Sequence, residues 1–91
     1  MIPLRLDRGG EGELVSIEGE TVALVSPRAY APGAPIEMTA LTEADIPLRG
    51  KSLGSKRRPD DRFDVRARLV NLKREDRERL ATLLSSPPAA G

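Results

Sequence analysis

The strongest constraint on the fold comes from residues 62–84, where an alternating segment leads directly into a charged amphipathic segment. The first half reads Arg-Phe-Asp-Val-Arg-Ala-Arg-Leu. Its apolar residues fall on one face and its charged residues on the other, a period of two that is typical of a half-buried strand. The apolar face consists of Phe63, Val65, Ala67 and Leu69.

The charged segment that follows predicts a helix with an apolar stripe. The stripe consists of Leu72, Leu80, Leu83 and Leu84. Asn71 is a suitable N-cap for this helix, and Glu75 and Arg79 have the favourable i,i+4 spacing. We expect the stripe to cover one end of a small barrel or to pack against a second protomer.

Upstream, short apolar runs separated by turn residues predict further strands. Residues 13–17 and 21–25 indicate a hairpin in which Gly19 supplies a positive φ. Residues 36–39 and 46–53 indicate two more strands, with Pro47 restricted to an edge or first position. Residues 54–61 are expected to form a polar hairpin tip. Together these features predict a mainly β fold, a small antiparallel barrel with one C-terminal helix.

The remaining segments have turn or linker composition. Residues 26–35 contain three prolines and a glycine, which predicts an ordered crossing loop with Tyr30 packed beneath it. Three glycines near the start separate residues 1–11 as a flexible arm or short edge strand. The folded domain is expected to span residues 12–84, and residues 85–91 are expected to be a disordered tail.

Composition narrows the classes of function. The chain has 91 residues, no histidine and no cysteine, so it lacks the usual acid/base group, thiol nucleophile and zinc ligands. We therefore expect no enzyme activity, no catalytic residues and no metal site. No apolar run is typical of a signal peptide or a membrane span, and no disulfide can form, which favours a cytoplasmic protein. A net charge of +1 is too small to attract nucleic acid at long range.

Four segments, in their order along the chain, resemble the bacterial PilZ domain. They are Gly-Glu-Leu-Val-Ser-Ile-Glu-Gly-Glu-Thr-Val-Ala-Leu (12–24), Tyr-Ala-Pro-Gly-Ala-Pro-Ile-Glu-Met-Thr (30–39), Phe-Asp-Val-Arg-Ala-Arg-Leu-Val-Asn-Leu (63–72) and Lys-Arg-Glu-Asp-Arg-Glu-Arg-Leu-Ala-Thr-Leu-Leu (73–84). The resemblance implies a six-stranded barrel with a closing helix, and a role in bacterial signalling or motility. Well-known members of that family bind cyclic di-GMP.

The motifs by which the family holds this nucleotide are altered here. An Arg-x-x-x-Arg motif is replaced by Arg5-Leu-Asp-Arg8, one residue short. In the Asp/Asn-x-Ser-x-x-Gly motif, Ser16, Glu18 and Thr21 replace the three specified residues. Arginines at a fixed reach grip phosphates, whereas a carboxylate at Glu18 would repel them. The resemblance thus implies an adaptor that works through protein contacts, with cyclic di-GMP binding weak or lost.

Two alternatives remain open at this point. A cyclic di-GMP receptor would use Arg5, Arg8 and Ser16 together with Arg57 and Arg58 of the hairpin tip. A small-barrel nucleic-acid binder would use five basic residues, Lys56, Arg57, Arg58, Arg66 and Arg68. For the adaptor, Arg66, Arg68 and Arg77 are the candidate partner contacts. The identity of the partner and the oligomeric state cannot be derived from the sequence.

Overall fold

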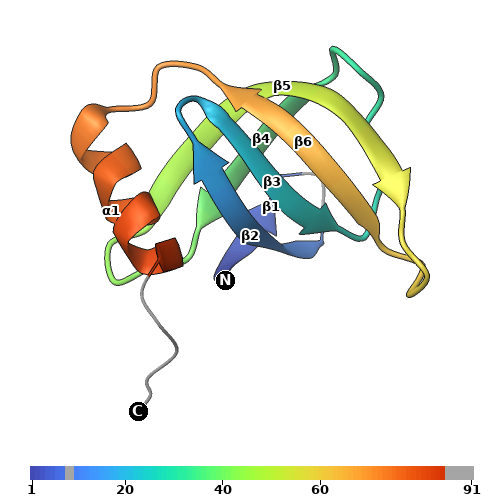
Figure 1. Ribbon diagram of the computed structural model, residues 1–91, viewed down its shortest axis with the longest axis horizontal. Helices are drawn as coiled ribbons and strands as arrows, with labels where there is room; N and C mark the ends of the chain where they lie inside the picture. Colours follow the sequence, from blue (N-terminus) through green and yellow to red (C-terminus); the bar gives the residue numbers. More distant parts are fainter. Residues whose placement is uncertain (8–9, 86–91) are drawn as a thin grey trace.

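The computed structural model describes residues 1–7 and 10–85 and shows a closed β-barrel with a helix at one end (Figure 1). The elements are β1 (Ile2–Leu6), β2 (Glu11–Glu18), β3 (Thr21–Ser26), β4 (Pro35–Ala40), β5 (Ile46–Arg57), β6 (Phe63–Leu69) and α1 (Arg74–Ser85). The strand order around the barrel is β1-β2-β3-β6-β5-β4, and every neighbouring pair is antiparallel. The predicted antiparallel six-stranded barrel with one C-terminal helix is confirmed.

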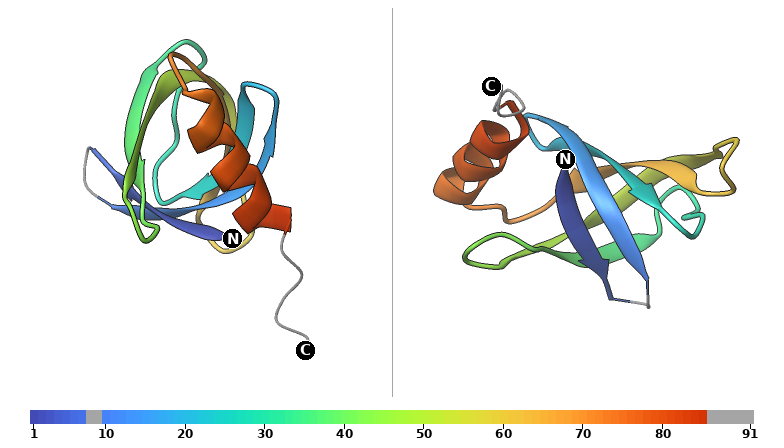
Figure 2. Two further views of the ribbon diagram at one scale, coloured as in Figure 1. Left: turned by 90° about the vertical axis from the view of Figure 1, so that its left-hand side faces the viewer. Right: turned by 90° about the horizontal axis from the view of Figure 1, so that it is seen from below.

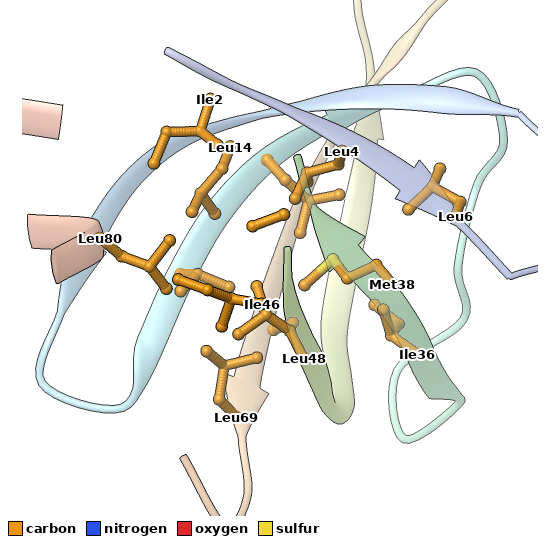
Figure 3. Close-up of a cluster of buried hydrophobic side chains, with 14 of the residues drawn as sticks. Ile2, Leu4, Leu6, Leu14, Ile36, Met38, Ile46, Leu48, Leu69 and Leu80 are labelled. Atoms are coloured by element: carbon orange, nitrogen blue, oxygen red, sulfur yellow. The ribbon is translucent and has the colours of Figure 1, made fainter. Parts of the chain in front are cut away.

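The core fills the inside of the barrel because alternate residues of each strand point inward. Figure 3 shows these side chains converging from all sides of the barrel wall. In β6 the alternation is as predicted, with Val65, Ala67 and Leu69 buried and Phe63 half-buried at the start of the strand. Residues of the opposite parity point outward, so the polar surface of the barrel consists of every second residue.

The first strand differs from the prediction for residues 1–11. Residues 2–6 form a short strand, β1, which was one of the two expected alternatives, but it pairs with β2 on one side and β4 on the other and is therefore not an edge strand. Ile2, Leu4 and Leu6 point into the core and are almost completely buried. The physical reason is their own alternation, since three apolar residues at a period of two gain more from burial than from remaining in solvent. Of the glycines that follow, Gly10 has φ 125° just before β2, and Gly12 lies within β2 opposite Leu4.

Helix α1 covers the barrel end that contains the β2–β3 turn and the β4–β5 loop (Figure 2). Leu80 points into the core and is fully buried, while Leu72 and Leu84 pack at its margin. Of the two expected roles for the stripe, covering the barrel end is the one observed. Leu83 was predicted to belong to the stripe, but it lies on the outer side with 44% exposure. None of the helices within residues 1–7 and 10–85 is long and apolar enough to cross a bilayer.

Two predicted details of the helix are wrong. The helix begins at Arg74, so Asn71 is not its N-cap and instead adopts a left-handed conformation with φ 54° in the preceding turn. The i,i+4 pair that forms joins Arg74 Nε to Glu78 Oε1 at 3.2 Å, one position earlier than the predicted pair. The first difference arises because the two residues after Asn71 extend the connection before the helix starts.

Strand β5 is longer than predicted because of a β-bulge. The register against β6 shifts between Ser52 and Gly54, and the strand then continues to Arg57. Gly54 was expected to begin the hairpin tip, but it has φ 135° and allows the bulge that keeps β5 paired. The turn is therefore shortened to residues 58–62. Pro47 lies where β5 pairs with β4 alone, because pairing with β6 starts at Gly50.

The loop of residues 27–34 closes the other end of the barrel. Its Tyr30 packs against the core, as predicted. The Tyr30 amide donates to Ser55 Oγ at 3.1 Å, and its carbonyl accepts from the hydroxyls of Ser52 and Ser55. The predicted positive φ at Gly19 in the β2–β3 turn is also confirmed, at 60°.

The two neighbouring leucines of α1 give a direct test of how the helix is held. Leu80→Ala should lower the free energy of unfolding by about 3 kcal/mol, because it removes a fully buried side chain and leaves a cavity. Leu83→Ala, the same change at an exposed site, should lower it by less than about 1 kcal/mol. Urea unfolding followed by circular dichroism measures both values. Equal losses would contradict the placement of Leu80 in the core.

Candidate functional site

Four of the five residues predicted to hold a cyclic dinucleotide lie in the described part of the chain, and these four do not come together. Arg5 points outward from β1, opposite Glu11 of β2 and Thr39 of β4. Ser16 lies on the outer face of β2, five positions beyond Glu11 and thus roughly 15 Å along the strand. Arg57 ends β5 and Arg58 begins the β5–β6 turn, six or more positions beyond Lys51, where the pairing of β5 with β4 ends. Arg8 lies outside the described residues.

The basic residues of the β5–β6 turn are neutralised by acids of the same hairpin. Arg57 Nη2 lies 2.7 Å from Asp61 Oδ1. Arg58 bridges two carboxylates, with Nη1 at 2.8 Å from Asp64 Oδ1 and Nε at 3.3 Å from Asp60 Oδ1. Asp64 belongs to β6 but pairs with Arg58 of the turn, not with an arginine of its own strand. These contacts place at least one carboxylate against each guanidinium, which opposes the binding of an added anion there.

The same contacts alter the ionisation of two groups in the turn. The backbone N–H of Arg62 donates to Asp60 Oδ1 at 3.1 Å and, together with the Arg58 guanidinium, holds the pKa of Asp60 below its ordinary value. In return, the hydrogen bonds to Asp64 and Asp60 raise the pKa of Arg58. The turn is therefore an internally satisfied charge network, which acts to order the hairpin.

A different set of cations gathers on the outer wall of β5 and β6. Lys51 of β5 lies directly opposite Arg68 of β6, and Arg66 is two positions from Arg68 on the same strand. All three side chains are exposed. Opposite residues of an antiparallel pair have Cβ atoms about 5 Å apart, and the two arginines are separated by about 7 Å. We call Lys51, Arg66 and Arg68 the basic face.

The basic face has few acids near it. Arg68 Nε lies 4.0 Å from Glu20 Oε2, at the limit of an ion pair. Across the part of the chain that the structure describes, Lys51 and Arg66 take part in none of the ion pairs. Like charges directly opposite one another destabilise a sheet, so the pairing of Lys51 with Arg68 is unfavourable in the isolated protein.

The residues around the basic face are small or apolar. Arg66 lies between Ala23 of β3 and Gly54 of β5, and Arg68 has Thr21 on its β3 side. Beside them Leu53, the extra residue of the bulge, is 53% exposed. The surface therefore presents three cations flanked by small residues, with one exposed apolar side chain at its edge.

The third predicted partner contact, Arg77, lies on α1 beyond Glu20. Arg77 and Glu20 both line a small hollow of about 220 Å³ between the helix and the β2–β3 turn. Glu20 thus lies between Arg68 and the helix. The structure brings Arg66 and Arg68 together and places Arg77 at the adjacent end of the barrel.

Two larger hollows lie elsewhere on the surface. One, of about 580 Å³, lies on the outer side of β1, β4 and β5 and contains Arg5 and the Glu37–Arg49 ion pair. The other, of about 730 Å³, lies between α1, the start of β1 and the β4–β5 loop, and is lined mainly by apolar side chains. Within residues 1–7 and 10–85, no group of three acids is placed to hold a metal ion.

Sequence reasoning missed Lys51 and Leu53. The alternation of β6 identified Arg66 and Arg68 as outward-facing, but the register that brings Lys51 opposite Arg68 depends on the bulge in β5. The signal that was present is Gly54 inside a strand pattern, which is a known mark of a bulge.

No family model, curated protein or solved structure matches this chain.

The charge network of the β5–β6 turn predicts a measurable titration. In the wild-type protein, the Asp60 carboxyl should titrate below its ordinary value of 3.8. Arg58→Gln should raise that pKa only part of the way, because the Arg62 N–H, the larger contributor, remains in place. Nuclear magnetic resonance of the carboxyl carbon across the acid range measures both values.

The sign of the linked stability follows from this shift. A pKa lower in the folded state than in the unfolded state stabilises the fold above the ordinary pKa, and the contribution disappears as pH falls through the folded value. Asp60→Asn should therefore have a lower unfolding free energy than wild type at pH 6. The difference between the two proteins should shrink below pH 4. An Asp60 pKa at or above the ordinary value would contradict the network.

Proposed function

We propose that this protein is a PilZ-like adaptor of bacterial signalling or motility, which acts in the cytoplasm by binding another protein and not by catalysis. The resemblance of its four sequence segments to the PilZ domain suggests the role, and a closed six-stranded barrel followed by a helix is the architecture that this resemblance implies. The absence of histidine and cysteine supports a non-enzymatic function.

One observation carries the proposal, which is the dispersal of the residues expected to hold cyclic di-GMP. Arg5 and Ser16 lie on different strands and far apart, and Arg57 and Arg58 are engaged by acids of their own hairpin. A diphosphate requires several cations at one place, held by charge-assisted hydrogen bonds. The dispersal of these cations therefore supports a protein that has kept the barrel but lost the capacity to bind the nucleotide.

Binding of nucleic acid has less support. Of the five basic residues expected for it, Arg57 and Arg58 are already paired with acids. The two aromatic residues, Tyr30 and Phe63, pack against the core and offer no platform on which bases could stack.

Calorimetric titration with cyclic di-GMP tests the proposal. We expect no binding tighter than about 100 µM, because the cations needed to grip the phosphates do not converge. The double variant Arg5→Ala/Arg8→Ala should give the same result as wild type. Arg28→Ala, which removes an exposed cation outside every predicted site, is the matched control.

Micromolar binding that the Arg5→Ala/Arg8→Ala variant abolishes and Arg28→Ala does not would overturn the adaptor proposal. That result would instead support a cyclic dinucleotide receptor.

A further inference from the structure

On the basic face, cations of two neighbouring strands lie together with few close acid partners. Three cations lie on two neighbouring strands, and Glu20 approaches Arg68 only to 4.0 Å. Asp64 lies two positions from Arg66 on the same face of β6, but its ion-pair partner is Arg58 of the turn. By contrast, Arg49, Arg57, Arg58 and Arg74 all have acid partners at 2.7–3.3 Å. The net charge of the chain is only +1, but the basic face carries a local excess of positive charge. The Lys51–Arg68 pair stays unfavourable until an external anion lies between the two side chains.

The shape of the basic face indicates which class of anionic ligand can bind there. Gly54, Ala23 and Thr21 flank the arginines, so a chain lying along β6 could approach closely. Alternate side chains of an extended peptide repeat about every 7 Å, which equals the separation of Arg66 and Arg68. Leu53 adds an exposed apolar contact at the edge, which suits a peptide better than a phosphate backbone.

We infer that the basic face binds an extended acidic segment of a protein partner, with carboxylates at alternate positions meeting Arg66 and Arg68 and one of them also neutralising Lys51. This inference rests on the proposed adaptor function and names the chemistry of its partner. Each arginine forms charge-assisted hydrogen bonds with a carboxylate, and Leu53 contacts an apolar residue of the segment.

The probe is a synthetic peptide, Thr-Glu-Thr-Glu-Thr-Leu-Thr with blocked ends, titrated into the full chain to millimolar concentration. Amide chemical shifts should move at Ala23, Gly54, Arg66 and Arg68 and hardly at all on β1. A peptide of the same composition with adjacent glutamates, Thr-Thr-Glu-Glu-Thr-Leu-Thr, should bind at least about threefold more weakly, because only one carboxylate can face β6. Raising the salt concentration should weaken the first peptide.

Variants of the face provide the matched comparison. Arg66→Thr and Arg68→Thr should each weaken the alternating peptide by about tenfold, the effect of losing one charge-assisted contact. Threonine suits a strand surface, so both variants should fold. Arg28→Thr makes the same change of charge and residue in a loop outside the basic face, and it should leave the affinity within about twofold of wild type.

Lys51→Thr gives a second, independent measurement. Removing the cation opposite Arg68 should raise the midpoint of thermal unfolding by about 1–3 °C while weakening the peptide, because the repulsion is relieved and a ligand contact is lost. A variant that is more stable and binds less cannot owe its weaker binding to misfolding. A lower midpoint would contradict the unfavourable pairing on which the inference depends.

The inference is overturned if the alternating peptide shifts no amide of the basic face, or if the two peptides bind equally. It is also overturned if a single-stranded oligonucleotide or vesicles containing anionic lipid bind this face more tightly than the peptide. In those cases the adaptor proposal still stands or falls on the cyclic di-GMP titration, which probes other residues.

Discussion

Strand β1 pairs with β2 on one side and with β4 on the other, and this double pairing closes the barrel. Leu4 shows the arrangement, since it lies opposite Gly12 in one neighbour and Ala40 in the other and is fully buried. Without β1, the facing edges of β2 and β4 would be unpaired and the core would be open on that side. An open edge is a site for pairing with other chains, and closure removes it.

Closure also determines where a function can be located. The interior is filled by side chains from all six strands and by Leu80 from the helix, so the barrel encloses a core and not a ligand cavity (Figure 3). Binding therefore belongs to the outward-facing residues, which alternate along each strand. Their neighbours across the sheet are fixed by the register, and the register of β5 against β6 is what places Lys51 opposite Arg68.

Much of this fold could be predicted from alternation and turn residues, since β6 and the order of the hairpins could be identified from patterns of period two. The segments around residues 2–6 and around Gly54 were harder to predict. Ile2, Leu4 and Leu6 alternate as clearly as β6 does, but the glycines that follow them have linker composition and led to the prediction of an arm or a short edge strand. Likewise Gly54 was interpreted as a turn, although its positive φ serves a bulge. In both cases a glycine was compatible with two structures, and long-range pairing decided between them.

The candidate site divides in the same way. The outward positions of Arg66 and Arg68 follow from local alternation, whereas the neutralisation of Arg58 by Asp64 and the meeting of Lys51 with Arg68 depend on the hairpin register.

Photo-crosslinking in the native host tests whether the basic face binds an acidic segment of a protein. A photoreactive amino acid replaces Leu53 at the basic face or Leu83 on the helix, two leucines of similar exposure. The account predicts a crosslink from position 53 that maps to an acidic segment of a protein, and little or none from position 83. Crosslinking mainly from position 83, or from position 53 to a segment without acidic residues, would contradict it.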